Sequence, residues 1–167
     1  MKIKMTGPRA FLPLAIVLSV AGFQSTAYAA SVGLKVNANQ TQLEATTNGN
    51  CSQNNTNGCV RANGVMQINF NLAQASCASG GNWALSKVYL GNSKNNWGNI
   101  STVAASDFNA NASSGVVTPT SQSPTHIGIR NNNSQAYTIW YTVTATCGSS
   151  TIELDPRIIN DGTGNPN

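Results

Sequence analysis

Four cysteines are the residues of this 167-residue chain whose type and spacing point most directly to chemistry: Cys51, Cys59, Cys77 and Cys147. An even number of cysteines in an exported chain is typical of disulfide bonds. Of the three possible pairings we expect Cys51–Cys59, which closes an Asn- and Gly-rich loop, and Cys77–Cys147, which joins the ends of two strands. A zinc site is the alternative, but no C-x2-C knuckle is present, and we expect none.

Groups suited to acid–base catalysis are scarce. His126 is the one histidine of the chain, and no G-x-S-x-G motif accompanies it, so we expect it to be structural or simply exposed. Glu153 and Asp155 lie two residues apart on an expected strand, which is more typical of a solvated face than of a glycosidase cleft. Blue copper requires two histidines. The sequence therefore predicts no catalytic residue, no metal ligand and no cofactor, and we expect the protein not to be an enzyme.

The C-terminal segment LDPRIINDGTGN, residues 154–165, is rich in oxygen ligands of the kind that calcium prefers. It lacks the spacing of an EF-hand loop and the repeated units of calcium-binding β-rolls. A plain turn at Asp161-Gly162 is the favoured interpretation, with an ion site as the alternative.

Two tryptophans are the candidates for ligand binding. Trp97 lies in the polar segment GNSKNNWGN, and Trp140 lies among threonines on one face of an alternating strand. An exposed indole beside amides and hydroxyls is a common means of binding a sugar ring, because the ring stacks on the indole while polar groups bind its hydroxyls. The alternative is structural: Trp140 faces a second sheet or lies under a loop, and Trp97 folds back onto the edge of the domain.

Strict alternation identifies the strands that must position these groups. Residues 137–147, YTIWYTVTATC, place Tyr137, Ile139, Tyr141 and Val143 on one face, together with Cys147 at the end. Residues 65–73, VMQINFNLA, alternate equally clearly and lead into Cys77. Further strands are expected at 30–39, 83–91 (with Ala84, Val88 and Leu90 inward), 99–105, 115–119, 126–130 and 151–159.

These elements predict an all-β fold. Seven or eight short strands separated by Asn-, Ser- and Gly-rich turns favour an antiparallel β-sandwich of immunoglobulin-like or related type, held by two disulfides. A jelly roll or a small barrel is the alternative. We expect a single domain over residues 31–167, with a short flexible C-terminal tail.

Residues 1–30 have the order of a secretory signal peptide: a basic start, an apolar run and small residues before the cleavage point. The apolar run is too short to span a bilayer, and no integral membrane segment is expected after cleavage. We therefore expect a bacterial protein exported to the periplasm or to the cell surface and exterior. Without the leader, six basic and five acidic side chains remain, a net charge of +1. No basic patch for nucleic acid is left, and the expected surface is Asn-rich and weakly charged.

The C-terminal region, residues 137–161, resembles the end of small exported bacterial immunoglobulin-like β-sandwich proteins. The resemblance rests on an alternating aromatic strand of Y-x-x-x-Y-x-V type, followed by a turn, a last strand and a D-P-x-I-x-N-like ending. The residues that match are Tyr137, Tyr141, Val143, Asp155, Pro156, Ile158 and Asn160. The resemblance implies a fold and brings no activity with it.

Two functions follow from these observations. The leading one is a non-catalytic exported protein that acts by surface recognition or assembly, as an envelope, extracellular matrix or adhesive component. The alternative is a carbohydrate-binding module that uses Trp97 and Trp140. The expected partners are a glycan, another envelope or matrix protein, or further copies of the chain.

Overall fold

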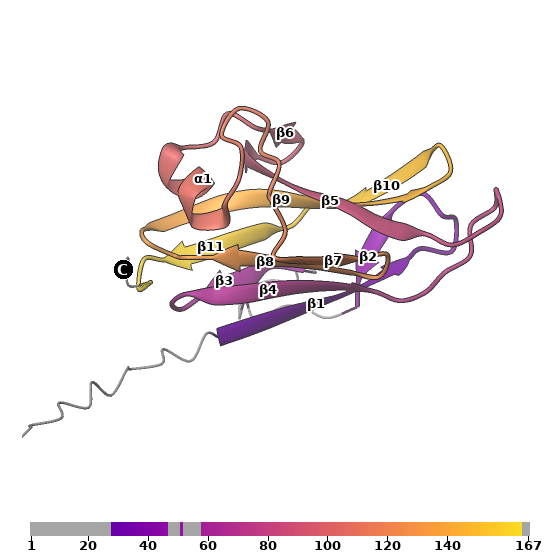
Figure 1. Cartoon of the computed structure of the whole chain (residues 1–167), viewed down its shortest axis with the longest axis horizontal. Coiled ribbons are helices and arrows are strands. Elements are labelled where there is room, and N and C mark those ends of the chain that lie inside the picture. Colours follow the sequence, from indigo (N-terminus) through magenta and orange to yellow (C-terminus); the bar gives the residue numbers. More distant parts are fainter. Residues whose placement is uncertain (1–27, 47–50, 52–57, 165–167) are drawn as a thin grey trace, which may run out of the picture.

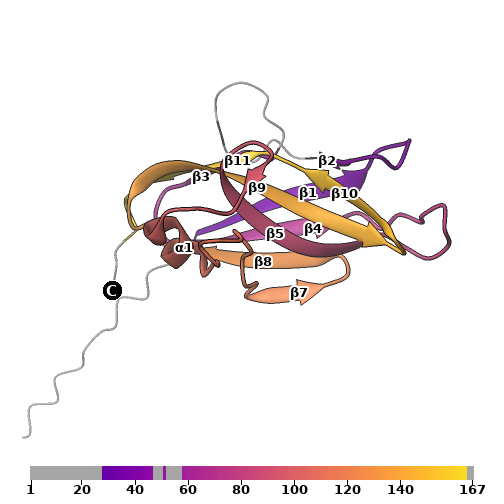
Figure 2. The ribbon, with the colours of Figure 1, turned by 90° about the horizontal axis from the view of Figure 1, so that it is seen from above.

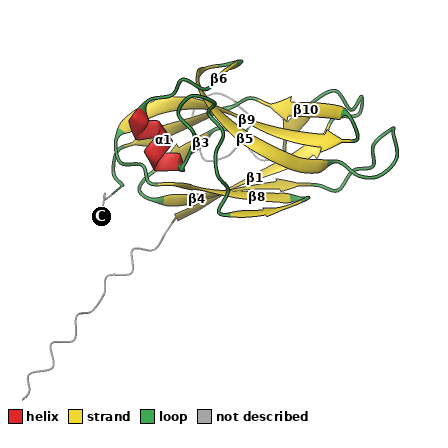
Figure 3. Ribbon diagram, turned by 45° about the horizontal axis from the view of Figure 1, so that its top comes forward, coloured by secondary structure: helices red, strands yellow, loops and turns green. Residues whose placement is uncertain are grey.

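The computed structural model describes residues 28–46, 51 and 58–164. Almost all of their regular structure is β, arranged as two sheets that pack face to face (Figures 1 and 3). A single short helix, α1 (Thr102–Phe108), accompanies them in this part of the chain. The prediction of a β-sandwich is therefore confirmed at the level of a mostly β, two-layered fold.

The first sheet, sheet A, has five strands in the order β2-β1-β4-β8-β7. Their bounds are Leu43–Ala45 for β2, Tyr28–Val36 for β1, Met66–Leu72 for β4, His126–Asn131 for β8 and Ser121–Ser123 for β7. The second, sheet B, has the order β3-β11-β9-β5-β6, and β10 also pairs with β9. Their bounds are Val60–Ala62 for β3, Arg157–Asp161 for β11, Ala136–Cys147 for β9, Ala84–Ser93 for β5, Asn96–Trp97 for β6 and Ser150–Leu154 for β10.

Both sheets are mixed, so the prediction of a purely antiparallel arrangement is wrong. β1 runs parallel to β4 from the pair Tyr28–Met66 to the pair Leu34–Leu72. β3 runs parallel to β11 over three residue pairs. Alternation of apolar and polar residues reports which face of a strand is buried, but it carries no information on the direction of the neighbouring strand.

The core lies between the two sheets and is formed by the alternating residues of their inner faces. In β9 the residues that the sequence assigned to the inner face are buried, including Tyr141 and Val143 at 0 % exposure, except Tyr137 at the start of the strand, which is half-buried. The ring of Tyr141 lies 5.3 Å from that of Phe70 in β4, which joins the two layers at their centre. Other fully buried side chains of this core are Val32, Leu34, Leu43, Val60, Ile68, Leu90, Ile127, Ile129 and Ile158.

Both predicted disulfides are present, Cys51–Cys59 and Cys77–Cys147. Cys77 follows β4 of sheet A, and Cys147 ends β9 of sheet B, so the second disulfide links the two layers. With all four cysteines paired, no zinc site can be built from them. The two disulfides indicate an oxidising environment outside the cytoplasm.

Residues 99–105 were expected to form a strand, but the chain enters α1 at Thr102. The Ser101 hydroxyl accepts a hydrogen bond from the Ala104 N–H, and Asn109 closes the helix in the left-handed conformation. These two caps stabilise a helix whose Thr and Val content favours a strand. Residues 115–119 also form no strand, and Val116 and Val117 make isolated bridges only.

The last predicted strand, 151–159, is split into β10 and β11 around Pro156. Both pair with the same edge of β9, and the register is the same on either side of the break, from Leu154–Val143 to Arg157–Trp140 (Figure 2). Continuing that register places Asp155 opposite Thr142.

In β5 a bulge between Leu85 and Lys87 shifts the inner face, so Leu85 is buried while Ala84 is only half-buried.

The predicted signal peptide lies mostly outside the described residues, and its last three residues, Tyr28 to Ala30, belong to β1. Among the described residues no helix is long and apolar enough to cross a membrane. At the other end, Gly162 and Gly164 each donate a backbone hydrogen bond to Asn133.

Candidate functional site

The two predicted tryptophans come together on the outer face of sheet B. Trp140 pairs directly with Gly91 of β5 on one side and with Arg157 of β11 on the other. Directly opposite residues in a ladder project to the same face of a sheet. Since Ile139 and Tyr141 point into the core, this row of residues points outward.

Trp97 reaches the same place from β6. The strand folds back from β5 at the pair Ser93–Asn96 and lies on the side of sheet B that faces away from sheet A (Figure 1). A methyl group added to Gly91 would lie 3.0 Å from Cε3 of Trp97 and would clash with the carbonyl oxygen of Asn96. Trp97 therefore lies against Gly91, the residue that also faces Trp140, and the missing side chain at Gly91 makes this close approach possible.

A second row of outward residues lies beside the first. Tyr89 of β5 pairs with Thr142 of β9, and the register places Asp155 on the other side of Thr142. Together the two rows form what we name the tryptophan face, defined by Tyr89, Trp97, Trp140, Thr142, Asp155 and Arg157.

Three polar atoms of the tryptophan face are buried and have no hydrogen-bond partner: Thr142 Oγ1, Asp155 Oδ1 and Arg157 Nε. They are the only such side-chain atoms in the described part of the chain. The neighbouring Thr144 is different, because its hydroxyl accepts from the Lys87 N–H at 3.2 Å and donates to the Lys87 carbonyl at 3.3 Å. Buried polar atoms are rarely left unpaired in folded proteins, so their concentration here marks an unusual surface.

Trp97 and Trp140 are both half-buried. Trp140 is not covered by a second sheet, but Thr142 beside it is only 1 % exposed although it lies on the outer face. Thr142 is therefore covered, while part of each indole stays accessible.

The electrostatics of this face are mixed in sign. Arg157 and Asp155 lie within it, and Lys87 and Glu153 flank it through their pairing with Thr144. Burial raises the pKa of Glu153, and the nearby charge of Asp155 raises it further. The face therefore carries both donors and acceptors without a dominant charge.

His126 was expected to be structural or simply exposed, and both of its ring nitrogens make hydrogen bonds on the outer face of sheet A. Nε2 lies 2.9 Å from Ser121 Oγ and Nδ1 lies 3.0 Å from Asn71 Oδ1. Sequence reasoning gave no role to Ser121 or Asn71. For Ser121, the one indication in the sequence is its position five residues before His126, across the β7–β8 turn. Nothing in the sequence indicates that Asn71 lies beside His126.

Asp161 ends β11, and Gly162 after it has a positive φ of 77°. Oδ1 of Asp161 accepts hydrogen bonds from the Asn133 side chain at 2.6 Å and from the backbone and hydroxyl of Thr163 at 3.1 and 2.7 Å. Within the described ranges no group of three or more His, Cys, Asp or Glu side chains could hold a metal ion.

Asp107 belongs to a second polar cluster that the sequence did not reveal. It is 2 % exposed at the end of α1, and its carboxylate accepts hydrogen bonds from the Ser134 N–H and from the Tyr137 hydroxyl. Close by, the side chains of Asn131 and Asn160 bond to one another within the core. Every partner in this cluster is internal, so we assign it to the fold rather than to a ligand site.

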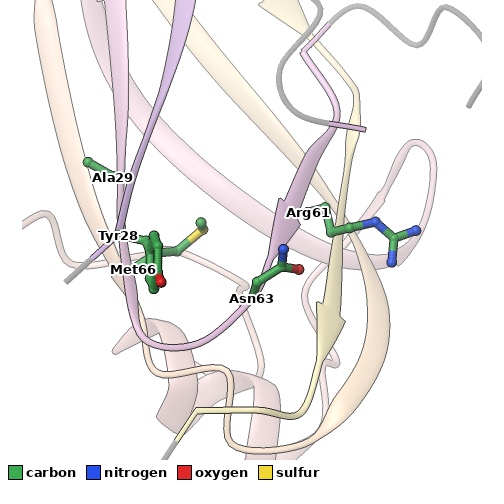
Figure 4. Close-up of a pocket in the computed structure, with 5 residues that line it drawn as sticks. All are labelled: Tyr28, Ala29, Arg61, Asn63 and Met66. Carbon is green, nitrogen blue, oxygen red and sulfur yellow. The ribbon is translucent and has the colours of Figure 1, made fainter. Parts of the chain in front are cut away.

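A hollow of about 200 Å³ lies between the start of β1 and β3, away from the tryptophan face, and is lined by Tyr28, Ala29, Arg61, Asn63 and Met66. Figure 4 shows Tyr28, Ala29 and Met66 on one side and Asn63 and Arg61 on the other. Tyr28 and Ala29 precede both expected cleavage points, after Ala29 or Ala30, so this hollow loses part of its wall in a processed chain.

Comparison with models of known protein families found no match, and comparison with curated proteins found none either.

Proposed function

We propose that this protein is a non-catalytic exported protein that acts by surface recognition or assembly, and that the tryptophan face is its contact surface. The observation that carries the proposal is the position of Trp97 and Trp140, which come from different strands and both lie at Gly91. Exposed or half-exposed aromatic side chains are over-represented at recognition sites. The two disulfides support a location in the periplasm or at the cell surface.

We further propose that the sandwich is of the immunoglobulin-like type. In support, the Cys77–Cys147 disulfide joins a strand end of sheet A to a strand end of sheet B, as a staple between layers does. The likeness of the C-terminal region to exported bacterial sandwiches of this type supports the same interpretation.

A carbohydrate is the ligand class that the composition of the face favours. A sugar presents a flat apolar face for an indole and hydroxyls at its edge that both donate and accept. Beside Trp140, the half-buried side chains of Arg157 and Asp155 supply a donor group and an acceptor group to this face. The mixed charge of the face suits a neutral glycan better than a strongly charged partner.

The experiment is a glycan array with the secreted protein and two variants, Trp140→Ala and Trp140→Phe. We expect Trp140→Ala to weaken binding by about 5- to 150-fold, because loss of one aromatic contact costs about 1–3 kcal/mol at such sites. Trp140→Phe keeps an aromatic face and should retain most of the affinity. Thr138→Ala, on the same face of β9 but outside the tryptophan face, is the matched control.

Binding that is equal in all four proteins would exclude this face as the glycan site. A native protein that binds no glycan and sediments as a polymer, with Trp140→Ala sedimenting as a monomer, would instead assign the face to assembly. Unchanged thermal unfolding of each variant establishes that the fold is intact.

A further inference from the structure

Ser121, His126 and Asn71 form a hydrogen-bonded chain across three strands of sheet A. The Ser121 hydroxyl of β7 lies 2.9 Å from Nε2 of His126 in β8, and Nδ1 of the same ring lies 3.0 Å from Oδ1 of Asn71 in β4. A serine, an imidazole and a side-chain carbonyl in this order have the connectivity of a nucleophile, a general base and the group that orients the base.

The amide of Asn71 sets the direction of the chain. Its Nδ2 donates to Ser31 Oγ at 3.0 Å, which leaves Oδ1 facing the imidazole. Because Oδ1 can only accept, Nδ1 of His126 is the ring nitrogen that carries the proton. Nε2 is then the acceptor, and the Ser121 hydroxyl donates to it. The neutral ring therefore presents its basic nitrogen to the serine.

Gly128, between His126 and Arg130 on the outer face of β8, has no side chain, and side chains of the neighbouring strands fill the room above it. A methyl group added there would clash with Ser121 Oγ, would lie 2.5 Å from Nε2 of Gln67 and would lie 3.2 Å from Oδ1 of Asn69. The Gln67 amide donates one N–H to Thr120 Oγ1 at 2.6 Å and has a second N–H. A nucleophilic oxygen and an amide donor thus converge on the same space above Gly128.

We propose that Ser121 is a nucleophilic serine that accepts an acyl group from an ester. Ser121 Oγ attacks the ester carbonyl carbon while its proton moves to Nε2 of His126, and the carbonyl oxygen becomes an oxyanion within reach of Gln67. The carbon–alkoxide bond then breaks, the alkoxide takes the proton from His126, and the acyl group stays on Ser121. The products are one acyl-serine and one alcohol.

Asn71 acts in this step as a positioning residue, because it holds the tautomer of His126 and touches no reacting atom. Ser121 is exposed on the outer face of sheet A, whereas Gly128 beneath it is buried. Small or unbranched acyl groups on a good leaving group are the substrates that fit such a site. The step ends at the acyl-serine, one per chain, and is not a catalytic turnover, so it is compatible with the non-catalytic role proposed above. The tryptophan face lies on the other sheet, so each proposal can fail without the other.

The test is labelling of the secreted protein with a fluorophosphonate probe, followed by peptide mapping. We expect the label on Ser121, formed about 100-fold faster in the wild type than in His126→Gln, since a positioned general base contributes at least about that factor. Ser123→Ala is the matched control: Ser123 is an exposed hydroxyl of the same strand, opposite His126 in the register, and should be dispensable. Asn71→Asp should keep the labelling rate, and Asn71→Ala should reduce it.

Label on Ser121 at the same rate in His126→Gln would overturn the proposal, as would label spread over several serines. To separate chemistry from folding, the wild type is also labelled in denaturant, where the rate should fall to that of His126→Gln. A rate that survives denaturation contradicts a site built by the fold. Release of p-nitrophenolate from p-nitrophenyl acetate, one equivalent per chain, gives an independent measure of the same step.

Discussion

The hydroxyl of Tyr137 donates a hydrogen bond of 2.8 Å to the carboxylate of Asp107. The contact joins the start of β9 to the end of α1, and the Ser134 N–H reinforces it with bonds of 3.2 and 3.1 Å to the two oxygens of the same carboxylate. Asp107 is a buried acid with no basic partner recorded among the described residues, so these donors are what makes its burial tolerable. The helix is held to the sandwich mainly by this polar contact and by its buried Phe108.

Removal of the carboxylate should therefore be costly. We expect Asp107→Ala to lower the free energy of unfolding by about 2–4 kcal/mol, because it leaves the Tyr137 hydroxyl and the Ser134 N–H without a partner. Tyr137→Phe removes a single bond and should cost about 1–2 kcal/mol. Urea denaturation followed by tryptophan fluorescence measures both. A cost for Asp107→Ala no larger than that of Tyr137→Phe would contradict the role given to the carboxylate.

Alkaline pH should unfold the protein cooperatively. Burial raises the pKa of Tyr141 far above that of a free phenol, and burial followed by the bond to Asp107 raises the pKa of Tyr137. An unfolded chain ionises its phenols near pH 10 while these two stay protonated in the folded chain. Stability is therefore retained below about pH 10 and lost as the pH rises above it. Phenolate absorbance and circular dichroism should change together; phenolate signal from these residues before unfolding would refute the prediction.

Acid should weaken the C-terminal turn through Asp161. Burial acts to raise the pKa of Asp161, but hydrogen bonds from Thr163 and Asn133 outweigh it and hold the pKa below its usual value. A lowered pKa adds stability above the unfolded-state value of about 3.9, and this stability is lost as the pH falls through the folded-state value. Asp161→Asn should thus be less stable than the wild type at pH 7 and should lose less stability on acidification below about pH 4. The measurement is the free energy of unfolding as a function of pH for both proteins. The same decrease with falling pH in both would show that Asp161 does not contribute to the pH dependence of stability.

The two disulfides should contribute unequally. By loop entropy, Cys77–Cys147, with a sequence separation of 70, stabilises the fold by about 4.5 kcal/mol, and Cys51–Cys59, with a separation of 8, by about 2.5 kcal/mol. We expect the double variant Cys77→Ser/Cys147→Ser to lose more stability in urea than Cys51→Ser/Cys59→Ser. The reverse order would show that the short disulfide holds a segment on which the rest of the fold depends.

The features of the fold that depend on side-chain burial could be predicted from the sequence. The inner face of β9, the strand β4 and both disulfides agree with the prediction, because a period of two in apolar residues reports burial directly. The predictions that were wrong concern features that depend on which segments pair with one another. The parallel pairing of β1 with β4 leaves no trace in either strand, and α1 owes its existence to the caps at Ser101 and Asn109 rather than to its own composition.

The same division holds for the candidate sites. Trp97 and Trp140 could be singled out by their polar neighbours, but their meeting depends on the fold-back of β6 over Gly91. Asn71 and His126 are joined only by the register of β4 with β8. Juxtapositions across a sheet arise from strand order, which is settled by the packing of the whole domain and not by any local segment.

The strand order also has a consequence for how the protein folds as the chain emerges. All five strands of sheet A are complete at Asn131, whereas β9, β10 and β11 of sheet B follow it. A chain that emerges N-terminus first can therefore complete sheet A before β9, the central strand of sheet B, has emerged. During that interval Cys77 has only Cys51 and Cys59 to react with, since its partner is synthesised 70 residues later. The native pairing thus requires either that Cys77 stays reduced until Cys147 has emerged or that a wrong disulfide is later exchanged. The yield of folded protein should therefore depend on a thiol–disulfide isomerase.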